Sequence, residues 1–132
     1  MILLDTSFLI ALANPAEENH ARSVELSEEI GSMGESILLP EAVLAEFITF
    51  FCRRQNPKRA RANAGVVLGL ARLSVICSVE SECLAALEVL GKYSFSSYAD
   101  ALLVSLAQAR GITRIVSFDS DFDRVKGIKR LH

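Results

Sequence analysis

The sequence predicts an α/β fold in which a central, mainly parallel sheet of four to five strands carries helices on both faces. Short apolar runs alternate with longer segments of helical periodicity, and Pro and Gly residues mark the boundaries between them. A length of 132 residues, with 51% hydrophobic and 23% charged residues, is typical of one compact domain, which we expect to span residues 1–132.

The first expected strand ends on a carboxylate. The apolar run Ile2 to Leu4 stops at Asp5, after which apolar residues recur at helical spacing. Three later helices are expected to begin at Pro15, Pro40 and Pro57, because proline fits the first turn of a helix. The expected elements are strand 2–5, helices 7–13 and 15–31, strand 36–39, helices 40–53 and 57–72, strand 74–77, helices 80–92 and 97–110, strand 114–118, a short helix 120–125 and strand 128–130, with Gly34, Gly91 and Gly111 at helix ends.

The composition limits the environment and the partners. A net charge of −2 and a pI near 5.7 provide no global positive field for nucleic acid, so any contact with phosphate must be local. Cys52, Cys77 and Cys83 contain no Cys-x-x-Cys pair, and we expect buried thiols in a reducing compartment. No apolar run approaches the roughly 18 residues of a membrane span, and the apolar N-terminus lacks a basic leader. We therefore expect a cytoplasmic protein without a membrane partner.

Two of the expected strands are followed by carboxylates. Asp5 ends the first strand, and Asp119 is the first carboxylate after the buried run Ile115 to Phe118, with Asp121 and Asp123 close behind. The alternative for Asp119 is a polar turn in which Asp side chains accept hydrogen bonds from the local backbone. Three Asp residues in five positions exceed what such a turn needs, and we assign Asp123 to solvent.

Two helices carry the other candidates. Asp100 lies near the start of a segment that is apolar nearly all round, so this helix should be buried. The alternative role of Asp100 is to cap the helix together with Ser97. Glu46 flanks the apolar stripe of its helix beside Phe50, and its alternative is a surface position at the edge of that stripe.

Together these carboxylates predict a metal-dependent site. If the strands are parallel neighbours, their ends and the start of the buried helix share one edge of the sheet. Clustered carboxylates raise one another's pKa unless a cation neutralises them, and ligation by oxygen alone suits Mg²⁺ or Mn²⁺. Such an ion lowers the pKa of a bound water and stabilises the charge on a phosphodiester as it is cleaved.

Four segments resemble, in order and spacing, the acidic motifs of the PIN-domain family, and most closely those of the VapC-type toxins of toxin–antitoxin pairs. The resemblance spans nearly the whole chain. The segments are Leu4-Asp5-Thr6-Ser7, Ala45-Glu46-Phe47, Tyr98-Ala99-Asp100-Ala101-Leu102 and Ser117-Phe118-Asp119-Ser120-Asp121-Phe122.

This resemblance implies a three-layer α/β/α PIN-like fold and a Mg²⁺- or Mn²⁺-dependent endoribonuclease that acts on RNA. It also implies inhibition by a cognate antitoxin and, commonly, a homodimer. Asp5, Glu46, Asp100 and Asp119 match the catalytic acidic quartet of the family, in which Asp5, Asp100 and Asp119 would hold the metal and Glu46 would act as ligand or water-orienting base. Supporting positions matched in the same way are Thr6, Ser7, Ser117 and Asp121, and Ser117 stands where many members have Thr.

A basic run connects two of the expected helices. Residues 53–61 hold five cations and no acid, which is typical of either a solvated loop or a patch that contacts phosphate. An acidic segment of an antitoxin could use the same patch. Its cations are Arg53, Arg54, Lys58, Arg59 and Arg61.

Other functions stay open beside the leading hypothesis of a ribonuclease toxin. One is a catalytically inactive PIN-like module that binds RNA or protein, and another is a PIN nuclease that processes RNA outside a toxin–antitoxin system. A phosphoryl-transfer enzyme is a third class. It would need a second Asp two residues after Asp5, where Ser7 stands, or an acceptor Asp after the third strand, where Cys77 and Ser78 stand.

Overall fold

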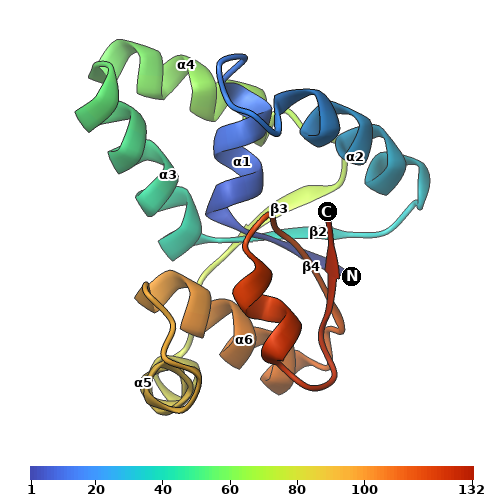
Figure 1. The fold of residues 1–132 in the computed structure, drawn as a ribbon, viewed down its shortest axis with the longest axis vertical. Coiled ribbons are helices and arrows are strands. Elements are labelled where there is room, and N and C mark those ends of the chain that lie inside the picture. The colour runs from blue at the N-terminus through green and yellow to red at the C-terminus, as the bar shows by residue number, and fades with distance from the viewer.

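The computed structural model describes residues 1–132 and contains one sheet of five strands (Figure 1). The strand order is β3-β2-β1-β4-β5, and every neighbouring pair is parallel. The predicted α/β class with a mainly parallel sheet is therefore confirmed. The strands are β1 (Ile2–Leu4), β2 (Ile37–Pro40), β3 (Leu73–Ile76), β4 (Arg114–Val116) and β5 (Lys129–Leu131).

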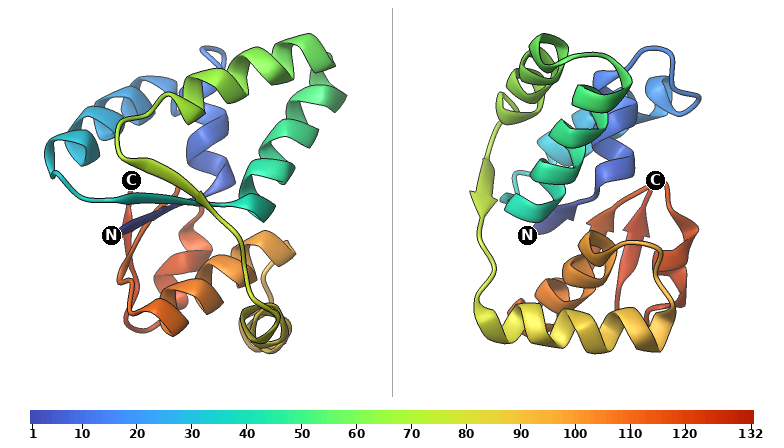
Figure 2. Two further views of the ribbon diagram at one scale, coloured as in Figure 1. Left: turned by 180° about the vertical axis from the view of Figure 1, so that it is seen from behind. Right: turned by 90° about the vertical axis from the view of Figure 1, so that its left-hand side faces the viewer.

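Helices cover both faces of the sheet and give the molecule three layers (Figure 2). Four helices lie on one side of the sheet and two on the other, and a short 3-10 helix follows β4 (Figure 1). The first group is α1 (Thr6–Ala13), α2 (His20–Ser32), α3 (Glu41–Arg54) and α4 (Pro57–Leu68); the second is α5 (Glu80–Tyr93) and α6 (Tyr98–Arg110); the 3-10 helix is η1 (Ser120–Arg124).

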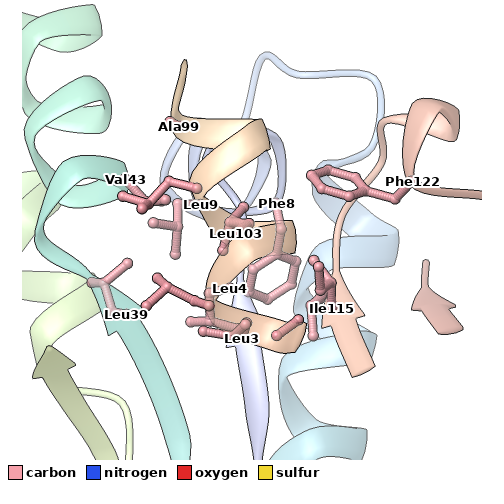
Figure 3. Packing of buried hydrophobic residues seen from close by; sticks show 14 of the residues in the cluster. Leu3, Leu4, Phe8, Leu9, Leu39, Val43, Ala99, Leu103, Ile115 and Phe122 are labelled. Atoms are coloured by element: carbon pink, nitrogen blue, oxygen red, sulfur yellow. The ribbon is translucent and has the colours of Figure 1, made fainter. Parts of the chain in front are cut away.

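The core forms around β1 because this strand lies in the middle of the sheet, between β2 and β4. Its residues Ile2, Leu3 and Leu4 are completely buried, as the unbroken apolar run predicts for a parallel sheet covered on both faces. Side chains of β1, α1, α3 and α6 pack against one another there (Figure 3). Helix α6 is buried continuously over residues 99–107, which confirms the expectation from its apolar surface.

The helix expected over 15–31 begins only at His20, so the predicted start at Pro15 is wrong. The polar atoms of Asn14 close a turn instead of opening a helix. Its side-chain Oδ1 accepts from the amide of Ala16 at 3.2 Å, and its carbonyl accepts from the amide of Glu17 at 3.0 Å. A capping residue followed by proline is thus compatible with a local turn as well as with a helix start.

Three other expectations need correction. Gly91 does not end a helix: α5 continues to Tyr93, and Ser94 follows with a φ of 54°. Gly34 and Gly111 do follow helix ends, with φ angles of 71° and 64°.

The cysteines are all free thiols, but Cys77 is exposed and the other two are half-buried, so the expected burial is wrong. Helix α4 stops at Leu68, before its expected end at 72.

The helices of the structure are too short, or too polar, to cross a lipid bilayer.

Candidate active site

The strand order reverses between β1 and β4, and open α/β sheets bind ligands in the crevice beside the carboxyl ends of such strands. Asp5 directly follows β1, and Ser117 directly follows β4. The amide of Asp5 donates to the carbonyl of Val116 at 3.0 Å, which fixes the two strand ends side by side. The topology therefore delivers polar side chains of both strands to one edge.

A pocket with a volume of about 260 Å³ lies at this edge, and four carboxylates line it. Asp5 comes from the end of β1, Glu46 from α3, Asp100 from the first turn of α6, and Asp119 from the segment after β4. The structure thus brings together the four acids that the sequence singled out. The remaining lining residues are Thr6, Ser7, Ile10, Phe50, Ser96 and Ser97.

Asp5 is only 2% exposed and is the N-cap of α1. Its Oδ2 accepts from the hydroxyl of Ser7 at 2.6 Å, from the amide of Ser7 at 3.3 Å and from the hydroxyl of Ser117 at 2.7 Å. Burial nevertheless raises the pKa of Asp5 above its usual value of 3.8. Its Oδ1 is the one buried side-chain polar atom of the protein without a hydrogen-bond partner. Leaving a carboxylate oxygen in that state is costly unless it binds something.

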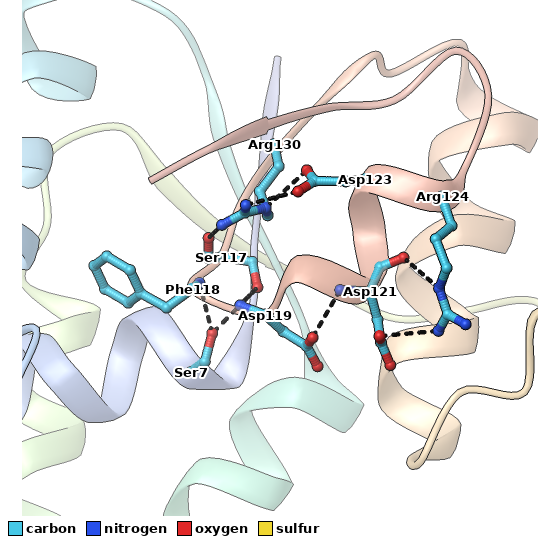
Figure 4. Close-up of polar contacts among 8 residues, drawn as sticks. All are labelled: Ser7, Ser117, Phe118, Asp119, Asp121, Asp123, Arg124 and Arg130. Carbon is cyan, nitrogen blue, oxygen red and sulfur yellow. Dashed lines mark hydrogen bonds and ion pairs between the residues drawn. The ribbon is translucent and has the colours of Figure 1, made fainter.

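Ser7 and Ser117 join the two strand ends through their hydroxyl groups. The hydroxyl oxygens lie 3.2 Å apart. The amide of Phe118 donates to Ser7 Oγ at 3.0 Å, and the amide of Asp119 donates to Ser117 Oγ at 2.9 Å (Figure 4). These bonds hold the backbone before Asp119 against α1. Both serines therefore link the Asp5 carboxylate to the segment that carries Asp119.

Asp100 lies in the first turn of α6, and its backbone rather than its side chain takes part in the cap of that helix. The hydroxyl of Ser97 accepts from the amide of Asp100 at 3.2 Å, so Ser97 caps α6, while the Asp100 side chain lines the pocket. The residue is 7% exposed. Burial, followed by the negative charges of Asp5, Glu46 and Asp119, raises the pKa of Asp100 to about 7. This carboxyl group therefore changes its charge near neutral pH.

Thr6 holds Glu46 at the pocket, because its hydroxyl donates a hydrogen bond to Glu46 Oε2. Glu46 is half-buried, between the buried stripe of α3 and solvent. Only one of its carboxylate oxygens is engaged by Thr6. The other oxygen is left for a ligand or a water molecule in the pocket.

The three Asp residues after β4 have different partners. Asp119 Oδ1 accepts from the amide of Asp121 at 2.8 Å, so the polar turn that was the alternative for Asp119 also forms. Asp121 is not part of the pocket wall; its carboxylate pairs with Arg124 at 3.0 Å. Asp123 is exposed, as expected, and pairs with Arg130 at 2.7 Å (Figure 4).

The structure divides the basic run 53–61. Arg53 and Arg54 line a hollow that shares Glu46 and Phe50 with the acidic pocket, whereas Arg59 lines a separate hollow beside the α3–α4 connection. Lys58 and Arg61 are exposed on α4 and line neither hollow.

Ile10, Phe50 and Ser96 belong to the pocket, although the sequence did not mark them as site residues. Phe50 was assigned to the apolar stripe of its helix. Its separation of four residues from Glu46 places both on one helix face, and this spacing could have identified it. No comparable signal marks Ser96.

The donor set of the pocket is suited to a hard divalent cation, because it consists of carboxylate and hydroxyl oxygens. The unpartnered Oδ1 of Asp5 fits this role. As the side chains stand, however, no three Asp, Glu, His or Cys residues converge closely enough to share one ion. Without a cation, the negative charges of the carboxylates repel one another. Three of these side chains would have to move closer together to bind one ion.

The PIN domain matches residues 2–128 of the sequence, which is nearly the whole chain. The chain belongs to the PIN-domain family. The four acids that the sequence motifs contain all line the pocket described above.

Two curated relatives align with the chain over 131 residues, at 27% identity and with 99% of each sequence covered. They are the VapC ribonuclease Mb1869c of Mycobacterium bovis and the ribonuclease VapC13 of Mycobacterium tuberculosis.

Solved structures show the same fold. The crystal structure of Mycobacterium tuberculosis VapC20, described as a toxin that cleaves the sarcin-ricin loop, superposes with a TM-score of 0.79 at 26% identity over 93% of both chains. VapBC2 from Rickettsia felis, solved with a DNA fragment from its promoter, gives a TM-score of 0.71 at 19% identity over 99% of this chain and 98% of that chain. The expected PIN-like architecture is confirmed.

Proposed function

We propose that this PIN-domain protein is an endoribonuclease that hydrolyses RNA phosphodiester bonds, and that it is the toxin of a type II toxin–antitoxin pair. The observation that carries the chemistry is the meeting of four carboxylates, from segments far apart in the sequence, in one pocket without a basic side chain. The curated relatives named as VapC ribonucleases, and the likeness to VapC20, support RNA as the substrate.

The proposed cofactor is Mg²⁺ or Mn²⁺. Asp5, Asp100 and Asp119 would hold it, because Asp5 Oδ1 lacks a donor and the pKa of Asp100 is raised by burial and by the neighbouring negative charges, which a cation would offset. When bound, the ion supplies positive charge to the cleaved phosphate and to the attacking water.

The protein supplies positioning and a proton acceptor. Glu46, which Thr6 holds through one oxygen, would accept a proton from the attacking water with the other. Ser7 and Ser117 donate hydrogen bonds to the Asp5 carboxylate, and Ser117 also accepts from the amide of Asp119. These bonds fix the two acids relative to each other at the strand ends. These hydrogen bonds restrict the movement of Asp5 and of Glu46, so that only small shifts would be needed to bring the carboxylates around an ion.

The proposed partners are an antitoxin protein and a second copy of the chain. VapBC2 of Rickettsia felis and VapBC of Salmonella typhimurium are described as DNA-bound complexes, and a Klebsiella pneumoniae neighbour is described as a toxin–antitoxin complex. We place the protein in the cytoplasm with its RNA substrate. Copurification of a small protein encoded beside its gene would test the antitoxin proposal.

The activity is tested by incubating the purified protein with a mixed RNA pool in Mg²⁺, in Mn²⁺ and in EDTA. Cleavage is expected with either cation and not in EDTA. Glu46→Gln is expected to abolish cleavage, while the matched control Glu41→Gln, an exposed acid on the same helix, should retain it. RNA binding without cleavage under all conditions would favour the inactive-module alternative.

A further inference from the structure

Arg130 of β5 contacts the chain on both sides of Asp119 (Figure 4). Its Nη1 donates to the carbonyl of Ser117, which precedes Asp119, at 3.4 Å. Its Nε and Nη2 donate to the two carboxylate oxygens of Asp123, which follows Asp119, at 2.9 and 2.7 Å. We refer to Ser117, Asp123 and Arg130 as the Arg130 clamp. One guanidinium group thus spans the segment that carries Asp119.

The clamp depends on the shape of arginine as well as on its charge. The Arg130 side chain is only 10% exposed, whereas that of Asp123 is 54% exposed. A planar guanidinium can bind both oxygens of a carboxylate and a third acceptor from fixed directions. A lysine ammonium in the same place keeps the charge but cannot present this geometry. The two arms of the clamp therefore form together only with arginine.

The first arm of the clamp supplies a donor where the hydrogen-bond ladder of the sheet ends. The amide of Ser117 donates at 3.0 Å to the carbonyl of Leu131, the last residue of β5. Ser117 is buried, and its own carbonyl accepts from Arg130. Because a buried carbonyl without a donor is costly, this bond helps to fix Ser117 relative to β5.

Both arms of the clamp lead to Asp119. The hydroxyl of Ser117 accepts from the amide of Asp119 at 2.9 Å and donates to Asp5 Oδ2 at 2.7 Å. On the other side, Asp123 belongs to η1, and Asp119 is the N-cap of that helix. Asp119 Oδ1 accepts from a backbone amide of η1 at 2.8 Å. Arg130 therefore holds the residue that binds the backbone of Asp119 and the turn that binds its side chain.

We infer that Arg130, anchored by Asp123, is a positioning residue that sets the place of Asp119 for metal binding. Arg130 does not line the carboxylate pocket, so it acts through Ser117 and η1. As the side chains stand, no three of the acids converge on one ion, and the place of Asp119 therefore decides how far it must move to join one. The inference rests on the proposed metal-dependent function and gives a role to Asp123, which the sequence assigned to solvent.

The test measures Mn²⁺ binding by the purified chain without RNA, from the electron paramagnetic resonance signal of the free ion. Arg130→Lys is expected to weaken Mn²⁺ binding about tenfold, because it keeps the charge but breaks the clamp. Asp123→Asn changes an exposed side chain, should fold normally, and is expected to cause a loss of similar size. The double variant should bind Mn²⁺ about as well as the weaker single variant, because both changes break one clamp.

The ion pair of Arg114 with Glu35 provides matched controls. Arg114 begins β4, so this pair lies at the end of the sheet opposite to the pocket. Arg114→Lys and Glu35→Gln make comparable changes in shape and charge there. Both control variants should bind Mn²⁺ with the wild-type affinity.

Further readouts separate positioning from a purely structural role. In RNA cleavage, the clamp variants should need more Mn²⁺ for half-maximal rate, while KM for RNA at saturating Mn²⁺ stays at the wild-type value. Wild-type Mn²⁺ affinity in folded Arg130→Lys and Asp123→Asn overturns the inference, even if their thermal midpoints fall. Mn²⁺ binding by the wild type without RNA cleavage contradicts the proposed ribonuclease, and the affinities of the variants still decide the role of the clamp. Absence of Mn²⁺ binding by the wild type overturns both the proposed cofactor and this inference.

Discussion

Asp100 and Glu82 are two carboxylates with the same exposure, 7%, but with opposite surroundings. Glu82 Oε1 and Oε2 accept from Arg110 at 2.7 and 2.8 Å, and Oε2 also accepts from the amide of Val79 at 2.9 Å. The Arg110 bonds hold the pKa of Glu82 below 4.5, whereas burial and neighbouring carboxylates raise the pKa of Asp100 to about 7. The fold thus provides a counter-ion where a buried acid joins two helices, and provides none in the pocket.

Glu82 stabilises the fold, whereas the acids of the pocket have carboxylate oxygens that no basic side chain neutralises. Glu82 connects the start of α5 to α6 through Arg110, and its backbone carbonyl accepts from Ser105 at 2.7 Å. Asp5, by contrast, keeps one oxygen without any donor.

The largest expected effect is on RNA cleavage. Asp5→Asn should reduce the rate by at least about a hundredfold, because it removes a charge from the site that must bind the cation. Glu82→Gln should keep the wild-type rate per folded molecule. A quenched-fluorescence RNA assay in Mg²⁺, with circular dichroism to confirm folding, measures both. Comparable losses in the two variants would contradict the distinction.

Stability should respond in the opposite way. Glu82→Ala is expected to lower the free energy of unfolding by about 2 kcal/mol, because it leaves Arg110 unpaired and removes the bond to the start of α5. Since the pKa of Glu82 is lowered in the folded state, its contribution is present above pH 4.5 and is lost as the pH falls through the folded-state pKa. Urea denaturation at pH 7 and at acidic pH measures the loss. The exposed Glu88→Ala on the same helix is the control.

Asp100→Asn should stabilise the protein in EDTA at pH 8. The folded-state pKa of Asp100 is about 7, against 3.8 for a free side chain, so the wild type binds an extra proton when folded and loses stability as the pH rises from about 4 to 7. The variant lacks this loss and should gain about 1 kcal/mol, because solvent screens part of the repulsion. The gain should disappear near pH 4 and shrink in Mg²⁺. A lower thermal midpoint of the variant in EDTA at pH 8 would refute this assignment.

The smallest effect is expected at a third carboxylate, Glu35. Hydrogen bonds from Arg114 and from the N-terminal amine lower its pKa to about 2. Because both side chains of the Glu35–Arg114 pair are partly exposed to solvent, Glu35→Gln should shift the thermal midpoint at pH 7 by less than about 2 °C. Differential scanning calorimetry tests this, and a shift as large as that of Glu82→Ala would show that exposure does not decide the difference.

The sequence predicts the fold well where a run of apolar residues is long or uninterrupted enough to indicate a buried element. The run before Asp5 and the apolar surface of residues 99–107 identify the central strand and the buried helix. Local chemistry is less decisive at Asn14-Pro15, because the same side chain caps a helix or closes a turn. At Gly91, a helix continues through glycine when its neighbours pack well.

The site could be predicted as a set of acids but not as a surface. Spacing identified Asp5, Glu46, Asp100 and Asp119, yet only the tertiary structure separates Arg53 and Arg54 from the rest of the basic run. The pairing of Asp121 with Arg124 likewise depends on how η1 turns, which removes Asp121 from the pocket wall. The order of the motifs in the sequence therefore identifies the acids of the pocket, whereas the tertiary structure determines which basic side chains lie near them.

Anomalous X-ray diffraction from crystals soaked in Mn²⁺ tests most directly whether the pocket carboxylates bind a cation together. We expect a single strong anomalous peak, or a close pair of peaks, between Asp5, Asp100 and Asp119. The peak should be absent from crystals of Asp5→Asn. A pocket without Mn²⁺ at saturating concentration, or Mn²⁺ bound only at exposed acids elsewhere on the surface, would contradict the proposed metal site.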